Sequence, residues 1–110
     1  MSKLPEEYLK HILQEVEFLL LKSRELSFDD FVKDEVKTRA FLRSLEIIGE
    51  ATKKIPENFR TSHQNVDWRA MAGMRDRLIH DYFGVDYEIV WDVVINEIPK
   101  LKSQLEELLK

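Results

Sequence analysis

Apolar side chains that recur three or four positions apart run through most of this 110-residue chain. Such spacing places side chains on one face of a helix. The first of these stripes consists of Leu9, Ile12, Leu13, Val16, Leu19 and Leu20. Glycine and proline are scarce, with three of each, which favours long helices over a turn-rich β architecture. We therefore expect an all-α protein, folded as an antiparallel bundle of four to five helices.

Capping residues, glycines and prolines set the expected helix ends. The expected helices cover residues 5–24, 27–32, 34–55, 67–84 and 86–110. Residues 56–66 are polar and are expected to form the only substantial loop. Pro99 should kink the last helix. Gly49 lies inside the third helix, where glycine costs about 1 kcal/mol relative to alanine, and we expect another helix to pass close to it.

The size and composition indicate one soluble domain covering residues 1–110. The chain has no cysteine, so disulfides and thiolate metal sites are excluded. No apolar stretch approaches the roughly 20 residues of a membrane span, and the first residues lack the apolar core of a signal peptide. We expect a cytoplasmic protein without a membrane-bound part and without a cofactor.

Positive charge is concentrated in residues 53–77, although the formal net charge of the chain is −4. This segment holds six basic residues and three acidic ones, and the segments on either side are net acidic. The basic residues are Lys53, Lys54, Arg60, Arg69, Arg75 and Arg77. Either they balance acids on neighbouring helices, or they form a local phosphate-binding surface. On the second interpretation Arg77, Lys53, Lys54 and Arg69 are candidates for RNA contacts.

Residues 75–82 bring together the groups needed to hold a phosphodiester and move its proton. On an ideal helix Arg75 and Tyr82 share a face, and Asp76 lies one turn before His80, where its carboxylate favours the protonated imidazole. His80 lies about 140° from Arg75 on such a helix, so the arginine stem or a looser helix end near Gly84 must bring them together. If it does, the guanidinium stabilises phosphate charge while the imidazole transfers a proton. Cleavage of this kind uses two proton-transfer groups, and a dimer would supply the second.

Structural roles for the same residues stay open at this point. Arg77 and Asp81, four apart, are also spaced for a surface ion pair, and Tyr82 is able to cap the core with its hydroxyl in water. Glu46 and Glu50 are spaced as a carboxylate pair, but no histidine lies at ligand spacing beside them, so we expect no metal site. Glu50 is instead expected to support Arg75 from the facing helix.

The segment 67–101 resembles the HepT-like toxins of the HEPN superfamily, a group of prokaryotic nucleotide-binding helical domains. The family pattern Arg-x4-His-x-Tyr is met by Arg75, His80 and Tyr82, with the polar residue Asp76 directly after the arginine. The segment 43–56, with its Gly-Glu-Ala element, is similar to the long helix of the family. The resemblance covers nearly the whole chain in order and length.

This resemblance implies a homodimer in which the two motifs face one cleft, and a metal-independent endoribonuclease that is the toxin of a type VII toxin–antitoxin pair. The implied antitoxin is a minimal nucleotidyltransferase that uses ATP and silences the toxin by transferring AMP to the motif tyrosine. Arg75 and His80 are then the catalytic residues, Asp76 and Glu50 support them, and Tyr82 is the AMP acceptor.

Two other functions are compatible with the sequence. The first is a catalytically silent helical partner that presents a substrate to a nucleotidyltransferase. The second is a structural bundle that uses only its apolar faces. The intact Arg-x4-His pattern favours the enzyme, because a scaffold has no chemical need for His80. A purely structural bundle leaves the basic segment unexplained.

Overall fold

The computed structural model of the protein describes residues 4–79 and 84–110. Its elements are α1 (Pro5–Ser23), α2 (Phe28–Lys33), α3 (Glu35–Lys54), α4 (Glu57–Ser62), α5 (Trp68–Ala72), α6 (Met74–Leu78), α7 (Tyr87–Asp92), the π-helical segment η1 (Val93–Glu97) and α8 (Ile98–Leu108). Among the described residues the one β-type pairing is an isolated antiparallel bridge between Ile79 and Val85. The expected all-α class is confirmed.

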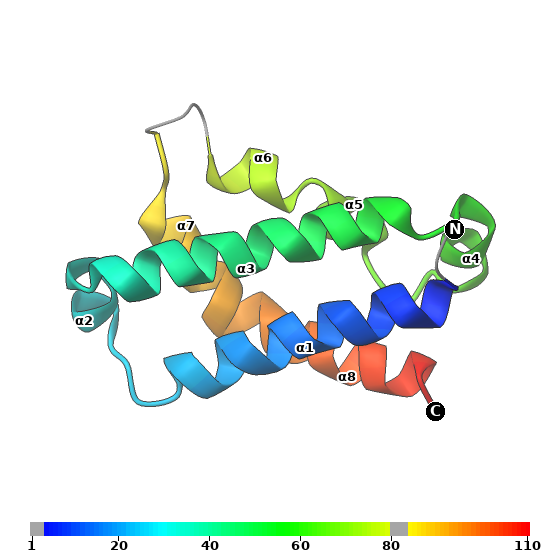
Figure 1. The fold of residues 1–110 in the computed structure, drawn as a ribbon, viewed down its shortest axis with the longest axis horizontal. Coiled ribbons are helices and arrows are strands. Elements are labelled where there is room, and N and C mark those ends of the chain that lie inside the picture. Colours follow the sequence, from blue (N-terminus) through cyan, green and yellow to red (C-terminus); the bar gives the residue numbers. More distant parts are fainter. Residues whose placement is uncertain (1–3, 80–83) are drawn as a thin grey trace.

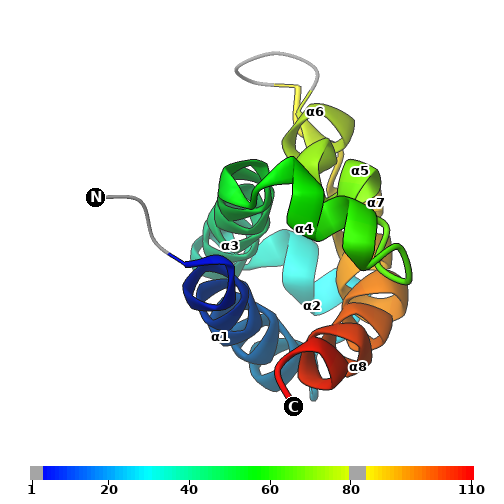
Figure 2. The same ribbon diagram turned by 90° about the vertical axis from the view of Figure 1, so that its right-hand side faces the viewer.

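Four rows of helix run in alternating directions (Figure 1). α1 and α3 lie side by side, α5 and α6 return along α3, and α7, η1 and α8 form one bent helix that passes α1. The short helices α2 and α4 lie at opposite ends of the bundle, and Figure 2 looks at the end where α4 lies. α6 is therefore held on α3 next to the start of the last helical row. It carries Arg75, the first residue of the Arg-x4-His pattern.

The apolar stripes predicted from the sequence form the core. The fully buried apolar side chains of α1 and α3 are Leu9, Ile12, Val16, Leu19, Phe41, Leu45 and Ile48, and Ile55 directly after α3 is also buried. Phe31 fixes α2 to the bundle, because its ring centroid lies 5.1 Å from that of Phe41 and 5.2 Å from that of Trp91. Leu101 and Leu105 of α8 belong to the same core. In the part of the chain that the structure describes, no helix has both the length and the apolar character to cross a membrane.

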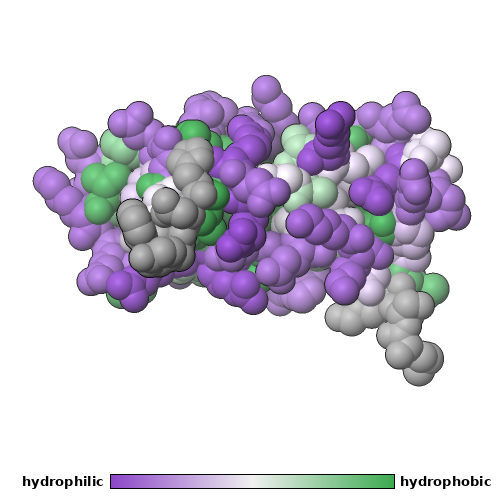
Figure 3. Space-filling view, turned by 90° about the horizontal axis from the view of Figure 1, so that it is seen from above, coloured by the Kyte–Doolittle hydropathy of each residue, from purple (hydrophilic) through white to green (hydrophobic). Residues whose placement is uncertain are grey.

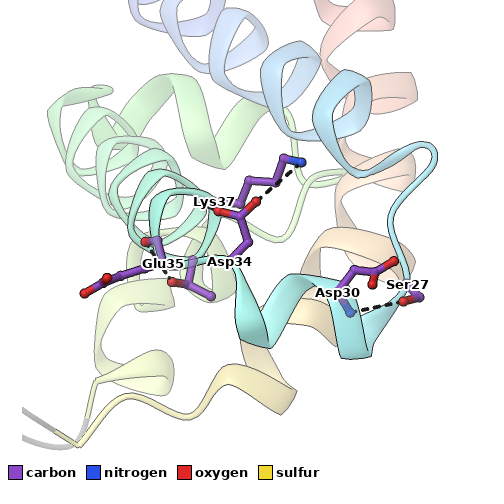
Figure 4. Close-up of polar contacts among 6 residues, drawn as sticks. Ser27, Asp30, Asp34, Glu35 and Lys37 are labelled. Carbon is purple, nitrogen blue, oxygen red and sulfur yellow. Dashed lines mark hydrogen bonds and ion pairs between the residues drawn. The ribbon is translucent and has the colours of Figure 1, made fainter.

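Side chains cap the starts of three helices. The Ser27 hydroxyl accepts a hydrogen bond from the backbone N–H of Asp30 at 3.1 Å (Figure 4). The Asp34 carboxylate accepts one from the backbone N–H of Lys37 at 3.0 Å, and its other oxygen lies 3.6 Å from Nζ of Lys37 (Figure 4). The Asp67 carboxylate accepts from Ala70 in the same way. These bonds satisfy backbone donors that have no partner inside the helix, so the starts of α2, α3 and α5 follow directly from the sequence.

Two expectations about the middle of the chain are wrong. Residues 56–66 were expected to form a loop, but they contain α4, a short helix without a fully buried residue, and an apolar pattern therefore cannot reveal it. The helix expected over 67–84 is interrupted at Gly73 and ends at Leu78. Ile79 is extended, with φ −123° and ψ 110°, and the Leu78 carbonyl accepts a hydrogen bond from the N–H of Asp86 at 3.0 Å. This contact with the next helical row replaces continued helix.

The last row of helix changes its winding before Pro99, where a kink was expected. η1 carries π-type hydrogen bonds over Val93–Glu97, and α8 begins at Ile98. Proline has no backbone N–H, so it cannot continue an ordinary α-helical ladder. At Pro99 the missing donor lies in the first turn of α8, where no intrahelical partner is needed.

Candidate functional site

Arg75 lies on α6 and meets Glu46 of α3. Its Nε is 3.5 Å from Oε2 of Glu46, and its side chain is 52% exposed whereas that of Glu46 is 21% exposed. The guanidinium is therefore held from one side and open to solvent on the other. This is a suitable arrangement for a group that binds phosphate oxygens.

Gly49 permits the close packing of this region. A Cβ atom at Gly49 would lie 3.3 Å from the backbone oxygen of Met71 and 3.6 Å from that of Ala72. The expected close approach of another helix at Gly49 is confirmed, and the neighbour is α5. Because α5 leads directly into α6, this contact also sets the distance between Arg75 and α3.

His80 and Tyr82 lie outside the described residues, as do Asp81 and Phe83. The helical spacing used to relate Arg75 to Tyr82 and Asp76 to His80 applies only as far as Leu78, where α6 ends. Asp76 is exposed on α6. The catalytic role of His80, the supporting role of Asp76 and the acceptor role of Tyr82 stay predictions.

Glu50, expected to support Arg75, pairs with a different arginine. Its Oε1 lies 3.8 Å from Nη1 of Arg43, two turns earlier on α3, and both side chains are largely exposed. Arg75 is paired with Glu46, one turn before Glu50. Any support that Glu50 gives to Arg75 therefore stays a prediction, and the ion pair of Arg75 is with Glu46.

Arg77 forms a two-pronged ion pair with Glu97 of η1. Nη1 donates to Oε1 and Nη2 donates to Oε2, both at 3.1 Å. The hydrogen bonds from Glu97 raise the pKa of the Arg77 guanidinium, partial burial opposes this, and the charges of Glu97, Asp92 and Asp67 add to the increase. The pair ties α6 to η1. Contact between Arg77 and RNA stays a prediction, and such a contact would compete with Glu97.

The other predicted RNA-binding residues are exposed. Lys53 and Lys54 lie in the last turn of α3, and Arg69 lies on α5. None of the three has an ion-pair partner among residues 4–79 and 84–110. Figure 3 looks down on the side of the molecule where α6 lies, and this surface is largely hydrophilic. These cations are thus available to a phosphate backbone.

Two other polar aromatic residues serve packing. The ring of His63 stacks on Phe59 with centroids 4.2 Å apart, and its Nδ1 lies 2.9 Å from the Phe59 carbonyl oxygen. The indole N–H of Trp68 donates to the His63 carbonyl at 2.8 Å. Within the described ranges there is no group of three or more His, Cys, Asp or Glu residues placed to hold a metal ion.

Comparison with known proteins bears on this geometry. The sequence profile described as "Ribonuclease HepT-like" matches residues 6–108. This chain belongs to the HepT-like ribonuclease family. It is 57% identical over 108 residues to a candidate RNase of Caldanaerobacter subterraneus subsp. tengcongensis, covering 98% of this chain and 96% of the relative. It is 44% identical over 110 residues to a probable ribonuclease HepT of Thermococcus cleftensis, covering all of both chains.

A candidate RNase of Methanocaldococcus jannaschii is 44% identical over 103 residues, which cover 94% of this chain and 85% of the relative. No solved structure matches this HepT-like protein. The family supports RNA as the substrate class, in agreement with the resemblance carried by the Arg-x4-His-x-Tyr pattern.

Glu46 and Glu97 are the partners of Arg75 and Arg77 in this HepT-like protein, and neither pairing was predicted from the sequence. Glu46 had been considered only as half of a possible metal pair. It lies 29 residues before Arg75 in the chain, and it is partly buried on α3, one turn before the exposed Glu50. Glu97 lies in the π-helical segment η1, so the α-helical repeat does not indicate which face of the helix it occupies.

Proposed function

We propose that this protein is a metal-independent endoribonuclease toxin whose catalytic residues are Arg75 and His80. The observation that carries the proposal is the position of Arg75, held at Nε by Glu46 while half of its side chain is open to solvent. It occurs in a chain of the HepT-like ribonuclease family that contains the complete Arg-x4-His-x-Tyr pattern.

The proposed reaction is an internal transesterification of RNA. The 2′-oxygen attacks the adjacent phosphorus, the bond from phosphorus to the 5′-oxygen breaks, and the products are a 2′,3′-cyclic phosphate and a 5′-hydroxyl. Arg75 stabilises the charge that grows on the non-bridging oxygens. His80 either takes the proton of the 2′-hydroxyl or gives one to the leaving 5′-oxygen. Asp76 and Glu50 are proposed to support this pair, and RNA is held by Lys53, Lys54, Arg69 and Arg77.

A homodimer completes the proposed site. One motif supplies a single histidine, whereas the reaction moves one proton onto an oxygen and another away from one. Two motifs related by a twofold axis and facing one cleft supply both groups. Mixing the unmodified protein with an excess of the His80→Ala variant should then lower the activity of each unmodified subunit, since exchange of subunits leaves only one histidine in a shared cleft.

The proposed antitoxin is a minimal nucleotidyltransferase. It transfers the adenylyl group of ATP to the phenol oxygen of Tyr82, with loss of the phenol proton and release of pyrophosphate. The attached AMP adds negative charge and bulk, which repel the RNA backbone. Tyr82 is thus the proposed acceptor, and the modification silences the toxin.

The deciding experiment is cleavage of a broad panel of RNAs in EDTA by the purified protein, with mass spectrometry to show that Tyr82 carries no AMP. We expect products with cyclic-phosphate ends from the unmodified protein and none from the His80→Ala variant. His11→Ala is the matched control, because His11 is an exposed histidine on α1, and this variant should keep full activity.

Three results would contradict the proposal. Loss of cleavage in EDTA with recovery on adding Mg²⁺ would contradict metal independence. Equal activity of the His80→Ala and unmodified proteins would remove His80 from the chemistry. An absence of cleavage by the unmodified, AMP-free protein would instead favour a silent helical partner of the nucleotidyltransferase.

A further inference from the structure

An open hollow lies where α4 meets α5, at the end of the bundle that faces the viewer in Figure 2. Its volume is about 730 Å³. The residues that line it and can form polar contacts are Glu57, Arg60, Thr61, Gln64, Asn65, Asp67, Arg69 and Gln104. α4 lies at the right-hand end of the molecule in Figure 1, and α6 lies well to its left. The hollow is therefore separate from the surface around Arg75.

Arg60 has an unsatisfied hydrogen-bond donor at this hollow. Its Nε is buried and has no hydrogen-bond partner among the described residues. A buried charged donor without an acceptor is costly, and it is rare in folded proteins. Arg69 lines the same hollow and is exposed. Neither arginine has a carboxylate within ion-pair distance in the described ranges, so both positive charges are available to an anionic ligand in the hollow that they line.

The side chains around these arginines indicate the class of ligand. Planar guanidinium groups match the oxygens of a phosphate, and the amides of Gln64 and Asn65 add donors. The carboxylates of Glu57 and Asp67 also line the hollow. They repel a phosphate with several charges, but they accept hydrogen bonds from hydroxyl groups. A singly charged phosphodiester beside ribose hydroxyls fits this mixture better than a free phosphate.

We propose that this hollow is a second RNA-binding site, in which Arg60 and Arg69 hold one stretch of backbone away from the bond that is cut. The proposal rests on the proposed function, because it takes RNA to be the substrate. A strand that reaches from the hollow to Arg75 follows α4, α5 and α6 along a molecule whose longest extent is 41 Å. The site therefore acts only on RNAs long enough to occupy both places.

The test uses an Arg60→Gln/Arg69→Gln variant in a His80→Ala background, so that bound RNA is not cut. The matched control is Lys22→Gln/Arg24→Gln, which removes two exposed charges from the far end of α1. Dissociation constants are measured for single-stranded RNAs of about 4 and about 16 nucleotides, a range typical of single-strand sites, at 50 and 200 mM salt.

With the longer RNA, loss of two phosphate contacts lowers the slope of log affinity against log salt by about 1.4, since each contact contributes about 0.7. Between 50 and 200 mM salt the parent then loses about sevenfold more affinity than the variant. The control keeps the parent slope. With the shorter RNA, variant and control bind alike. Arg69→Gln alone should give about half of the change in slope, and it tests the site without altering the half-buried Arg60.

A variant whose slope equals that of the control on the longer RNA overturns the proposal. Equal weakening on both RNA lengths overturns the separation from the cleavage site. Binding of AMP or inorganic phosphate at the hollow, without binding of RNA there, assigns the hollow to a small phosphate compound instead. Failure of the proposed function has a different signature, namely that the AMP-free parent cleaves no RNA whatever its slope.

Discussion

The ion pair between Arg77 and Glu97 should stabilise the fold by about 1 kcal/mol. The two side chains are 41% and 39% exposed, so water screens the pair and the value belongs to exposed pairs, which contribute about 0.2–1 kcal/mol. Two parallel N–H to carboxylate bonds at 3.1 Å place it at the upper end of that range. For a domain of this size we expect each single variant to lower the melting temperature by about 4 °C.

A double-mutant cycle measures this coupling. Arg77→Met, Glu97→Gln and the double variant are unfolded in urea at low salt and at about 1 M salt, where screening should reduce the coupling. The control cycle uses Arg39 and Glu35, a pair on one helix that is 76% and 79% exposed, for which we expect about 0.3–0.5 kcal/mol. A coupling at Arg77 no larger than the control, or one indifferent to salt, would refute this estimate.

The same variants decide whether Arg77 also binds RNA. If its guanidinium contacts phosphate, Glu97→Gln releases it and should tighten RNA binding, while Arg77→Met weakens binding. If Arg77 serves only to hold α6, neither change alters affinity once the fraction of folded protein is taken into account. The two roles therefore predict different results for the Glu97 variant, namely tighter RNA binding or unchanged affinity.

Three further expectations follow from the structure. Glu46→Gln should lower the turnover number on the order of tenfold, about 1.4 kcal/mol of transition-state stabilisation, with an unchanged urea midpoint; unchanged turnover would remove the positioning role toward Arg75. Gly49→Val should destabilise the fold by about 1–3 kcal/mol because the valine methyl groups press on α5. Gly49→Ala should be nearly neutral because a gain in helix propensity of about 1 kcal/mol offsets the tight contact. Equal stabilities of the two variants in urea would argue against this. The backbone N–H of Lys37 holds the pKa of Asp34 below its usual value of 3.8, so this cap stabilises fully above that pH and is lost as pH falls through the lower folded value; Asp34→Asn should flatten this part of an acid titration followed by circular dichroism, and an unaltered curve would contradict it.

Much of this fold could be predicted because the signals that define its helices lie close together in the sequence. An apolar stripe such as that of α1 shows which helix face is buried, whatever element packs against it. A cap such as Asp34 bonds to an atom only three residues away. α4 was missed because none of its residues is fully buried, so its sequence carries no apolar stripe. The end of α6 was missed because the Leu78 carbonyl bonds to Asp86, a contact that no helical repeat contains.

The candidate site was predictable in its residue types but not in its pairings. The pattern around Arg75 correctly indicated the HepT-like ribonuclease family, and Gly49 correctly indicated a neighbouring helix. The choice of Glu46 over Glu50 depends on how α6 crosses α3, and the partner of Arg77 depends on the winding of η1. Such pairings arise from tertiary geometry, to which a single sequence gives only indirect access.

The π-helical turn of η1 has a consequence for changes in chain length. A π-type turn takes one more residue than an α-helical turn, so the segment 93–97 holds one residue beyond what a continuous α-helix needs. Deleting that residue would let ordinary winding pass through and leave Leu101 and Leu105 facing the core, but it would turn Glu97 away from Arg77. The same deletion in α3 would rotate every later side chain by about 100°. We therefore expect insertions and deletions that change the ion pair between Arg77 and Glu97 but keep the fold to lie in η1.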